Sequence, residues 1–258
     1  MALRSLLYSA VLAIALGAVA GDEGCNPVAE VRAVSRFDGV HADDGIKVNV
    51  TVSPNANASL RVSANADFLS EVKSRVDHHT LMLELAPGKK SSCVMAEIQV
   101  PKPLLYASAS SNAEMTLCSV NGSLAASMGG ELHVGTLAAE KAVSIVADTG
   151  AEIKIREGKV DSLDVTCNNK SEVYLGNLKA RRAVAFAAGE SSVYDLTAGV
   201  ALVSASGKSE VGVTATQAVI LMCSNSEIKV RGSADVHSHA SSGCKVAHND
   251  TQISTILP

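Results

Sequence analysis

The 258-residue sequence has no tryptophan and few aromatic residues, with three phenylalanines and four tyrosines. It has no basic cluster longer than residues 179–182, and its net charge is -4. This mildly acidic balance argues against binding to nucleic acid or to an anionic membrane surface. The G-x-S-x-G motif is also missing, so the sequence gives no support to nucleophilic hydrolysis.

Long apolar runs are missing after the N-terminus. No later stretch reaches the ~18 apolar residues that predict a membrane helix, so we expect no membrane span. At the N-terminus, Arg4 precedes an apolar run over residues 6–16 and a small-x-small site at residues 18–20. This order predicts a signal peptide over residues 1–20 and a secreted or extracellular protein, with association with the cell surface as an alternative.

What the sequence does contain is a repeat of 16 to 21 residues. Each repeat has a turn of small residues, then a polar residue, then aliphatic residues at alternate positions. The residues at this position are Glu114, Glu131, Glu152, Glu172, Ser192, Glu210, Glu227 and Gly243, of which only the glycine is not polar. Alternation with period two predicts a strand with one buried face. Asp195 breaks the alternation beside Leu196, which predicts a one-residue bulge.

The length of the repeat selects among architectures. A propeller blade needs about twice this length, and the leucine-rich repeat consensus is missing. One turn of a parallel β-solenoid fits, because stacked turns pair each strand above and below. A β-sandwich is the alternative, but its turns have no reason to recur with the same neighbours.

The region before the repeats is organised differently. Residues 32–105 alternate expected strands with one expected short helix over residues 66–76, and they predict an irregular cap that covers one end of the solenoid. Residues 106–250 form the repeated coils of the same domain. Residues 21–31 are an expected N-terminal extension, and residues 251–258 are an expected tail.

Several segments in this order resemble a known family. They are "FDGV" from Phe37, "GIKV" from Gly45, "ADFLSEVKSRVDHHTLMLEL" from Ala66, and a V-P-x-P-L joint from Val100. Over residues 32–250 the chain resembles the auto-transporter adhesin head-GIN domain. The resemblance implies an all-β, right-handed parallel β-helix and an adhesive role. It implies no catalytic residues and no cofactor.

The column of glutamates is the first candidate site, and we single out Glu152, Glu172, Glu210 and Glu227. These side chains should point outward, because their neighbours point inward. Carboxylates ~4.8 Å apart repel by roughly 0.9 kcal/mol in water, so the column must stay hydrated or meet cations. It is therefore a solvated and partly neutralised surface, a surface that binds cations or a cationic partner, or a catalytic carboxylate pair.

Two tyrosines form a second candidate. Tyr174 and Tyr194 occupy matching outward positions in successive repeats, so their rings are expected to stack. Such a pair suits either structural packing or contact with a sugar. Near the C-terminus, His237, His239, Cys244 and His248 offer metal-ligand atoms, but their spacing matches no common closed site, and we expect no metal.

Cysteines and glycosylation signals fit a secretory route. All six cysteines follow residue 20, and fifteen connectivities are possible. Cys167 and Cys223 should lie three coils apart, roughly 14 Å, which exceeds the ~7 Å limit for a disulfide. Two other pairs are expected candidates, namely Cys93 with Cys118 and Cys223 with Cys244. Candidate N-glycosylation sites are Asn49, Asn57, Asn121, Asn169 and Asn249.

The sequence thus favours a secreted, non-enzymatic β-solenoid that binds an extracellular glycan or a cell-surface protein. Two alternatives remain. One is a polysaccharide-active lyase or hydrolase, because a ladder of carboxylates supplies the 5 to 9.5 Å separations that glycoside hydrolysis uses. The other is a structural matrix protein that associates with itself. The sequence sets neither the ligand nor the oligomeric state.

Overall fold

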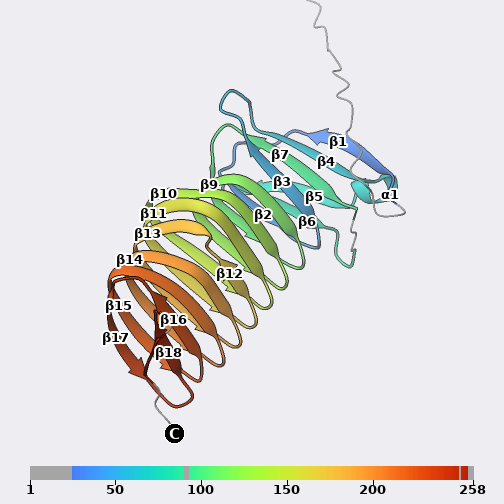
Figure 1. Cartoon of the computed structure of the whole chain (residues 1–258). Coiled ribbons are helices and arrows are strands. Elements are labelled where there is room, and N and C mark those ends of the chain that lie inside the picture. Colours follow the sequence, from blue (N-terminus) through green and yellow to red (C-terminus); the bar gives the residue numbers. More distant parts are fainter. Residues whose placement is uncertain (1–24, 90–92, 250, 255–258) are drawn as a thin grey trace, which may run out of the picture.

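The computed structural model describes residues 25–89, 93–249 and 251–254, and the expected signal peptide lies outside them. It is a parallel β-helix of about seven turns, as predicted. The coils stack along one axis, with a cap of differently arranged strands at the N-terminal end (Figure 1). None of the helices in the described ranges is long and apolar enough to cross a membrane.

The described residues of the N-terminal part form eight strands and one short helix: β1 (Pro27–Arg32), β2 (Gly39–Ala42), β3 (Lys47–Val52), β4 (Ser59–Asn65), α1 (Ala66–Leu69), β5 (Val72–Asp77), β6 (Thr80–Leu85), β7 (Met95–Val100) and β8 (Leu104–Ala109). The coils and the C-terminal end contain β9 (Glu114–Ser127), β10 (Glu131–Asp148), β11 (Glu152–Asn168), β12 (Glu172–Tyr174), β13 (Asn177–Ala188), β14 (Ser192–Ser206), β15 (Glu210–Ser224), β16 (Glu227–Arg231), β17 (Asp235–Ala240), β18 (Lys245–His248) and β19 (Thr251–Ser254). β1 lies largely in the expected N-terminal extension, and β19 in the expected tail.

Successive coils pair in parallel with like residues in register. Ile153 lies beside Val173, Val173 beside Val193, and Val193 beside Val211. All four side chains are fully buried. The aliphatic positions of the repeat therefore form continuous columns inside the solenoid, and their burial is the main source of stability because each coil removes apolar area from water.

Two irregularities in these columns stand out. Asp195 has a left-handed φ of 60°, the register shifts between Val193 and Leu196, and Leu196 fills the inner position. The predicted bulge is confirmed. The prediction for the last coil is wrong: Glu227 pairs with Lys245, not with Gly243. The turn before β18 is longer than the spacing of the repeats predicted, so the residue that continues the glutamate column lies two positions further along the sequence.

The cap winds out of sequence order. β2 lies between β6 and β8, and β3 lies between β7 and β9, all in parallel. β1, β4 and β5 add antiparallel pairs at the outer end. This layer covers the open strand edges that a bare coil would expose.

The predicted helix over residues 66–76 is too long. The helix ends at Leu69, and residues 72–77 form β5, which pairs antiparallel with β6 over six residues. Val72 packs inside, while Lys73 and Arg75 are exposed. Pairing with β6 overrides the helical propensity of this segment, as tertiary contacts commonly do.

The small-residue turns recur because they stack on one another. Thr149 and Gly150 both have left-handed backbones, as do Asn169 and Lys170 in the next coil. The amide of Gly150 donates to the carbonyl of Asn169 at 2.9 Å. Small and polar residues adopt the left-handed conformation at the lowest energetic cost, so they recur at the same corner of successive coils.

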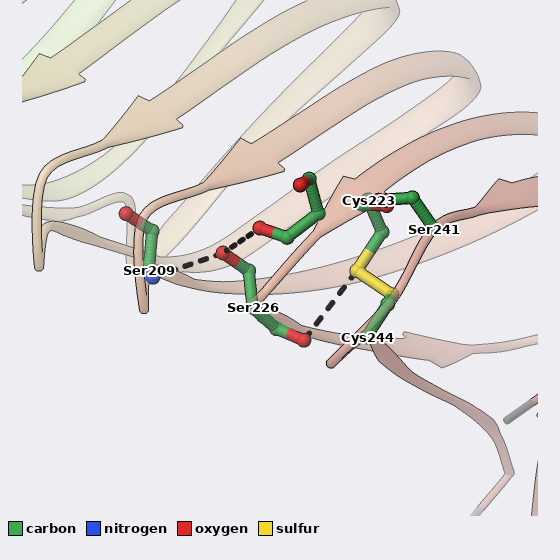
Figure 2. The surroundings of a disulfide bond; sticks show 6 residues. Ser209, Cys223, Ser226, Ser241 and Cys244 are labelled. Atoms are coloured by element: carbon green, nitrogen blue, oxygen red, sulfur yellow. Dashed lines mark hydrogen bonds between the residues drawn. A yellow bond between two sulfur atoms is a disulfide. The ribbon is translucent and has the colours of Figure 1, made fainter. Parts of the chain in front are cut away.

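Just after each of these turns, the later coils carry a buried serine. The amide of Ser171 donates to the hydroxyl of Ser191, and the amide of Ser191 donates to that of Ser209, both at 3.3 Å. The amide of Ser209 continues the series to Ser226 at 3.1 Å (Figure 2). This serine ladder satisfies backbone donors that would otherwise be buried without a partner.

Two disulfides hold the two ends of the domain. Cys223 bonds to Cys244, the pairing expected across neighbouring coils, and lies beside the last serine of the ladder (Figure 2). Cys25 bonds to Cys93, so the expected pair of Cys93 with Cys118 is wrong. Cys118 points outward on β9, whereas β1 pairs with β4 in the cap, so Cys25 just before β1 lies near Cys93. Cys118 and Cys167 are free thiols, exposed and buried respectively.

Candidate functional site

The predicted site residues lie together on one outward surface of the solenoid. We call this surface the polar face and define it by two neighbouring columns. The first contains Glu114, Glu131, Glu152, Glu172, Ser192, Glu210 and Glu227, with Lys47 before it and Lys245 after it. The second contains Thr116, His133, Lys154, Tyr174, Tyr194, Gly212 and Lys229. The parallel register places these side chains over one another because each coil repeats the same path.

Cations within the face neutralise much of the acid column. Lys154 lies 2.6 Å from Glu152, and Lys229 lies 2.6 Å from Glu210 and 3.6 Å from Glu227. The hydrogen bond to Glu152 raises the pKa of Lys154, and that to Glu210 raises the pKa of Lys229. Exposed ion pairs of this kind contribute about 0–1 kcal/mol each, so they order the face more than they stabilise the fold.

The two tyrosines form the aromatic centre of the face. The rings of Tyr174 and Tyr194 stack with centroids 4.7 Å apart and planes at 20°. The Tyr174 hydroxyl donates to Glu172 at 2.6 Å, which raises the pKa of Tyr174 above its ordinary range. Lys154 approaches the other face of the Tyr174 ring, 5.8 Å from its centre. The hydroxyl and the ring of Tyr174 therefore already have contacts within the same chain.

Tyr194 is placed differently. The acid column is interrupted at Ser192, so Tyr194 has no glutamate beside it in its own coil. In the next coil, the outward position after Glu210 is Gly212, which has no side chain to cover the Tyr194 ring. One side of the Tyr194 ring stacks on Tyr174, and toward the next coil Tyr194 and Gly212 line a common space.

That space is a hollow of about 180 Å³. Its polar lining consists of Tyr194, Asp195, Glu210, Thr214, Lys229 and Arg231. The hollow thus combines one aromatic ring with carboxylates and cations. Such a set can stack against a flat apolar surface of a ligand and hydrogen-bond to hydroxyl groups at its edge.

Sequence reasoning found Tyr194 and Glu210 but missed Asp195, Gly212, Lys229 and Arg231 as parts of one site. A signal was present in the sequence. Asp195 is the one position that breaks the aliphatic alternation, and the bulge turns its side chain outward, next to Tyr194. Bulges commonly re-aim side chains beside functional sites.

The other candidates separate into different regions. Within the described ranges, no group of three or more metal-binding side chains could hold an ion. Cys244 is bonded to Cys223, which removes it from the histidines near the C-terminus as a ligand. All five asparagines of the glycosylation signals are exposed; they are Asn49, Asn57, Asn121, Asn169 and Asn249.

The sequence matches a family model described as "Putative auto-transporter adhesin, head GIN domain" over residues 36–240. The chain belongs to this family. No curated protein matches the sequence of this head GIN chain.

Solved structures share the fold. A putative lipid binding protein from Parabacteroides distasonis superposes with a TM-score of 0.74 at 15% identity, covering 86% of this chain and 96% of that one. A putative adhesin from Parabacteroides merdae gives a TM-score of 0.70 at 14% identity, covering 86% and 95%. A second putative adhesin from P. distasonis gives 0.73 at 13% identity, covering 86% and 97%. At these identities the similarity establishes the architecture only.

Proposed function

We propose that the protein is a secreted, non-enzymatic adhesin-type protein whose polar face binds a glycan of a cell surface or matrix. The observation that carries the proposal is the half-open ring of Tyr194. Its second side borders a hollow with carboxylates, a lysine and an arginine. The adhesin family and two disulfides support an extracellular setting.

The chemistry of the hollow suits a single pyranose ring. The C–H side of a sugar can stack on Tyr194, while Asp195 and Arg231 hydrogen-bond to its hydroxyl groups. The volume of about 180 Å³ lies below the roughly 300 Å³ of a typical small-molecule pocket. One sugar residue fits, and we expect weak affinity for a single site.

Weak single sites fit adhesion, because several linked contacts raise the overall affinity without any new contact. The ligand should therefore be a polymer or a densely glycosylated surface rather than a free monosaccharide. The ordered lysines and glutamates beside Tyr174 would frame the sugar chain as it runs along the solenoid.

The test is binding of the mature protein, displayed in several copies on beads, to arrays of glycans and to whole cells. Wild type should retain a subset of glycans, and Tyr194→Ala should lower retention at least about tenfold, as removal of an aromatic anchor commonly does. Tyr194→Phe keeps the ring and should bind like wild type. Thr116→Val, on the same face but outside the hollow, is the matched control.

The same assay separates the alternatives. New reducing ends or unsaturated sugars, lost in Glu210→Gln, would identify a polysaccharide-active enzyme. Self-association with no glycan retained would favour a matrix protein. Retention of a glycan that is equal in wild type and Tyr194→Ala would contradict the role given to the hollow.

A further inference from the structure

The solenoid has a second outward surface with the opposite character. It is formed by the later halves of β11, β13, β14 and β15 and by β17. Its exposed members include Phe186 (41%), Ile220 (46%), Met222 (40%) and Val200 (37%), and Val184 and Leu202 are half-buried between them. We call these six residues and their row neighbours the apolar face. Contiguous exposed apolar patches of this kind commonly mark interaction surfaces.

The central row of this face is chemically symmetric. Over its last five windings, parallel pairing orders it as Asp164, Val184, Leu202, Ile220 and His237, and Ser144 of β10 precedes Asp164. Read from either end of these five windings, the row has a polar side chain that can enter a hydrogen bond, a β-branched aliphatic residue, and then the central leucine. In the described part of the chain neither Asp164 nor His237 forms an ion pair or a side-chain hydrogen bond.

Symmetry of this kind matches a two-fold axis. If two copies face each other with their long axes antiparallel, an axis along β14 places Leu202 against Leu202 of the second copy. Val184 then meets Ile220 of the second copy, and Asp164 meets His237, whose ring nitrogen can donate to the carboxylate. A two-fold interface requires a surface that is complementary to itself, and this row satisfies the requirement.

The adjacent row fits the same axis. Its order over the same five windings is Thr166, Phe186, Ser204, Met222 and His239, and the exposed Val146 of β10 precedes Thr166. The axis sets Phe186 against Met222 of the second copy, a favourable contact between sulfur and an aromatic ring. Ser204 faces Ser204 of the second copy, and Thr166 faces His239 of the second copy, so polar groups face polar groups.

The third row is consistent with the arrangement but adds less. Val200 meets Val200 of the second copy at the axis. Arg182 would face Ala218, and it lies 3.6 Å from Asp161 of its own chain, a carboxylate that it shares with Arg181. None of the five asparagines in glycosylation signals lies in the strands of this face, and Asn169, which directly follows β11, is the one next to it in the sequence.

We propose that the apolar face is a homodimer interface, in which two chains pack their sheets face to face with antiparallel solenoid axes. Five windings at ~4.8 Å and six residues at ~3.3 Å give roughly 480 Å² per copy, or about 960 Å² in total. This area is close to the lower limit of about 1,000 Å² for a specific interface, so the dimer dissociates readily on dilution. Pairing would also double the number of polar faces, each turned to the outside.

The test is sedimentation of the mature protein from about 1 µM to about 0.5 mM, a range that spans weak association. Wild type should shift from monomer to dimer. Leu202→Glu sets two carboxylates against each other on the axis and should raise the dissociation constant at least about a hundredfold. Thr116→Glu, an outward change on the polar face, should leave the dissociation constant unchanged, and circular dichroism should show the same fold for both.

A charge exchange then tests the orientation of the two chains. His237→Asp opposes Asp164 of the second copy and should weaken the dimer about tenfold. Adding Asp164→His to the same chain restores an imidazole opposite a carboxylate and should recover the wild-type constant. Monomer at every concentration, equal dimerisation of Leu202→Glu, or no recovery in the double variant would overturn the proposal. Binding to lipid vesicles by a protein that stays monomeric would also overturn it.

Discussion

The inner and outer sides of the same strands follow different rules. Inside, the column that runs from Ile153 to Ile228 changes only between valine and isoleucine. Outside, the neighbouring column changes from His133 through Lys154 to Tyr174 within two steps. The inner positions must fill a constant cross-section, because protein interiors are close-packed.

This difference separates the residues that determine the fold from those that are free to determine function. Inner residues define the coil, so exchanging them should change stability. Outer residues are free to vary from coil to coil, so the polar and apolar faces can differ although they share one core. Function is therefore expected from the outer columns, and an inner substitution should affect stability more than an outer one in the same strand.

The largest contrast is expected between the two free thiols. Cys167 is fully buried, and burial raises its pKa to about 11. At pH 8 only about one molecule in a thousand would carry its thiolate, the form that reacts. With a thiol reagent, Cys118 should label quickly, and Cys167 at least about a hundredfold more slowly until denaturant is added. Cys118→Ser should remove the fast phase alone. Labelling of Cys118 and Cys167 at the same rate would show that solvent reaches the inner column.

Truncation of an inner aliphatic residue comes next. Ile153→Ala leaves a cavity between two coils and should lower the free energy of unfolding by about 2–5 kcal/mol. Arg156→Ala, on the outer side of the same strand, should change it by less than about 0.5 kcal/mol. Denaturation in urea measures both. Similar losses for the two variants would contradict the division between inner and outer columns.

The sequence predicted most of the coil because periodicity reports the inner columns directly. It located the bulge at Asp195 through the same signal. It failed where the structure depends on distant pairing: β5 forms on β6 instead of extending α1, and Cys25 reaches Cys93 through the folding of the cap. Within the site, it found the tyrosines and glutamates but not the hollow, which depends on Gly212 and on the outward turn of Asp195.

Loss of the C-terminal disulfide should have the third largest effect. Cys223 and Cys244 are 21 residues apart, and closing a loop of that length stabilises a fold by about 3 kcal/mol in the chain-entropy model. The double change to alanine should lower the free energy of unfolding by about this amount. Cys118→Ala is the control for loss of a cysteine that has no disulfide. An unchanged free energy in the double variant would show that the last coil is held by its strand pairing alone.

A smaller loss is expected in the serine ladder. The Ser209 hydroxyl accepts from the amide of Ser191 and donates to the carbonyl of Ser206 at 2.7 Å. Ser209→Ala leaves a buried amide without its partner and should cost about 1–3 kcal/mol. Ser192→Ala, one position from the ladder but turned outward, should cost less than about 0.5 kcal/mol. Hydrogen exchange would locate the effect, since the Ser191 amide should exchange faster in the first variant only.

The smallest effect on stability, paired with the largest expected effect on glycan binding, belongs to Tyr194. Its ring is only partly buried and stacks on one neighbour, so Tyr194→Ala removes a contact of about 0.5–1.5 kcal/mol. Tyr194→Phe keeps the stacked ring and should be nearly neutral, since the hydroxyl of Tyr194 forms no hydrogen bond to other described residues. If Tyr194→Ala instead unfolded the domain, Tyr194 would behave as a core residue, and the separation of outer columns from the fold would fail at the centre of the polar face.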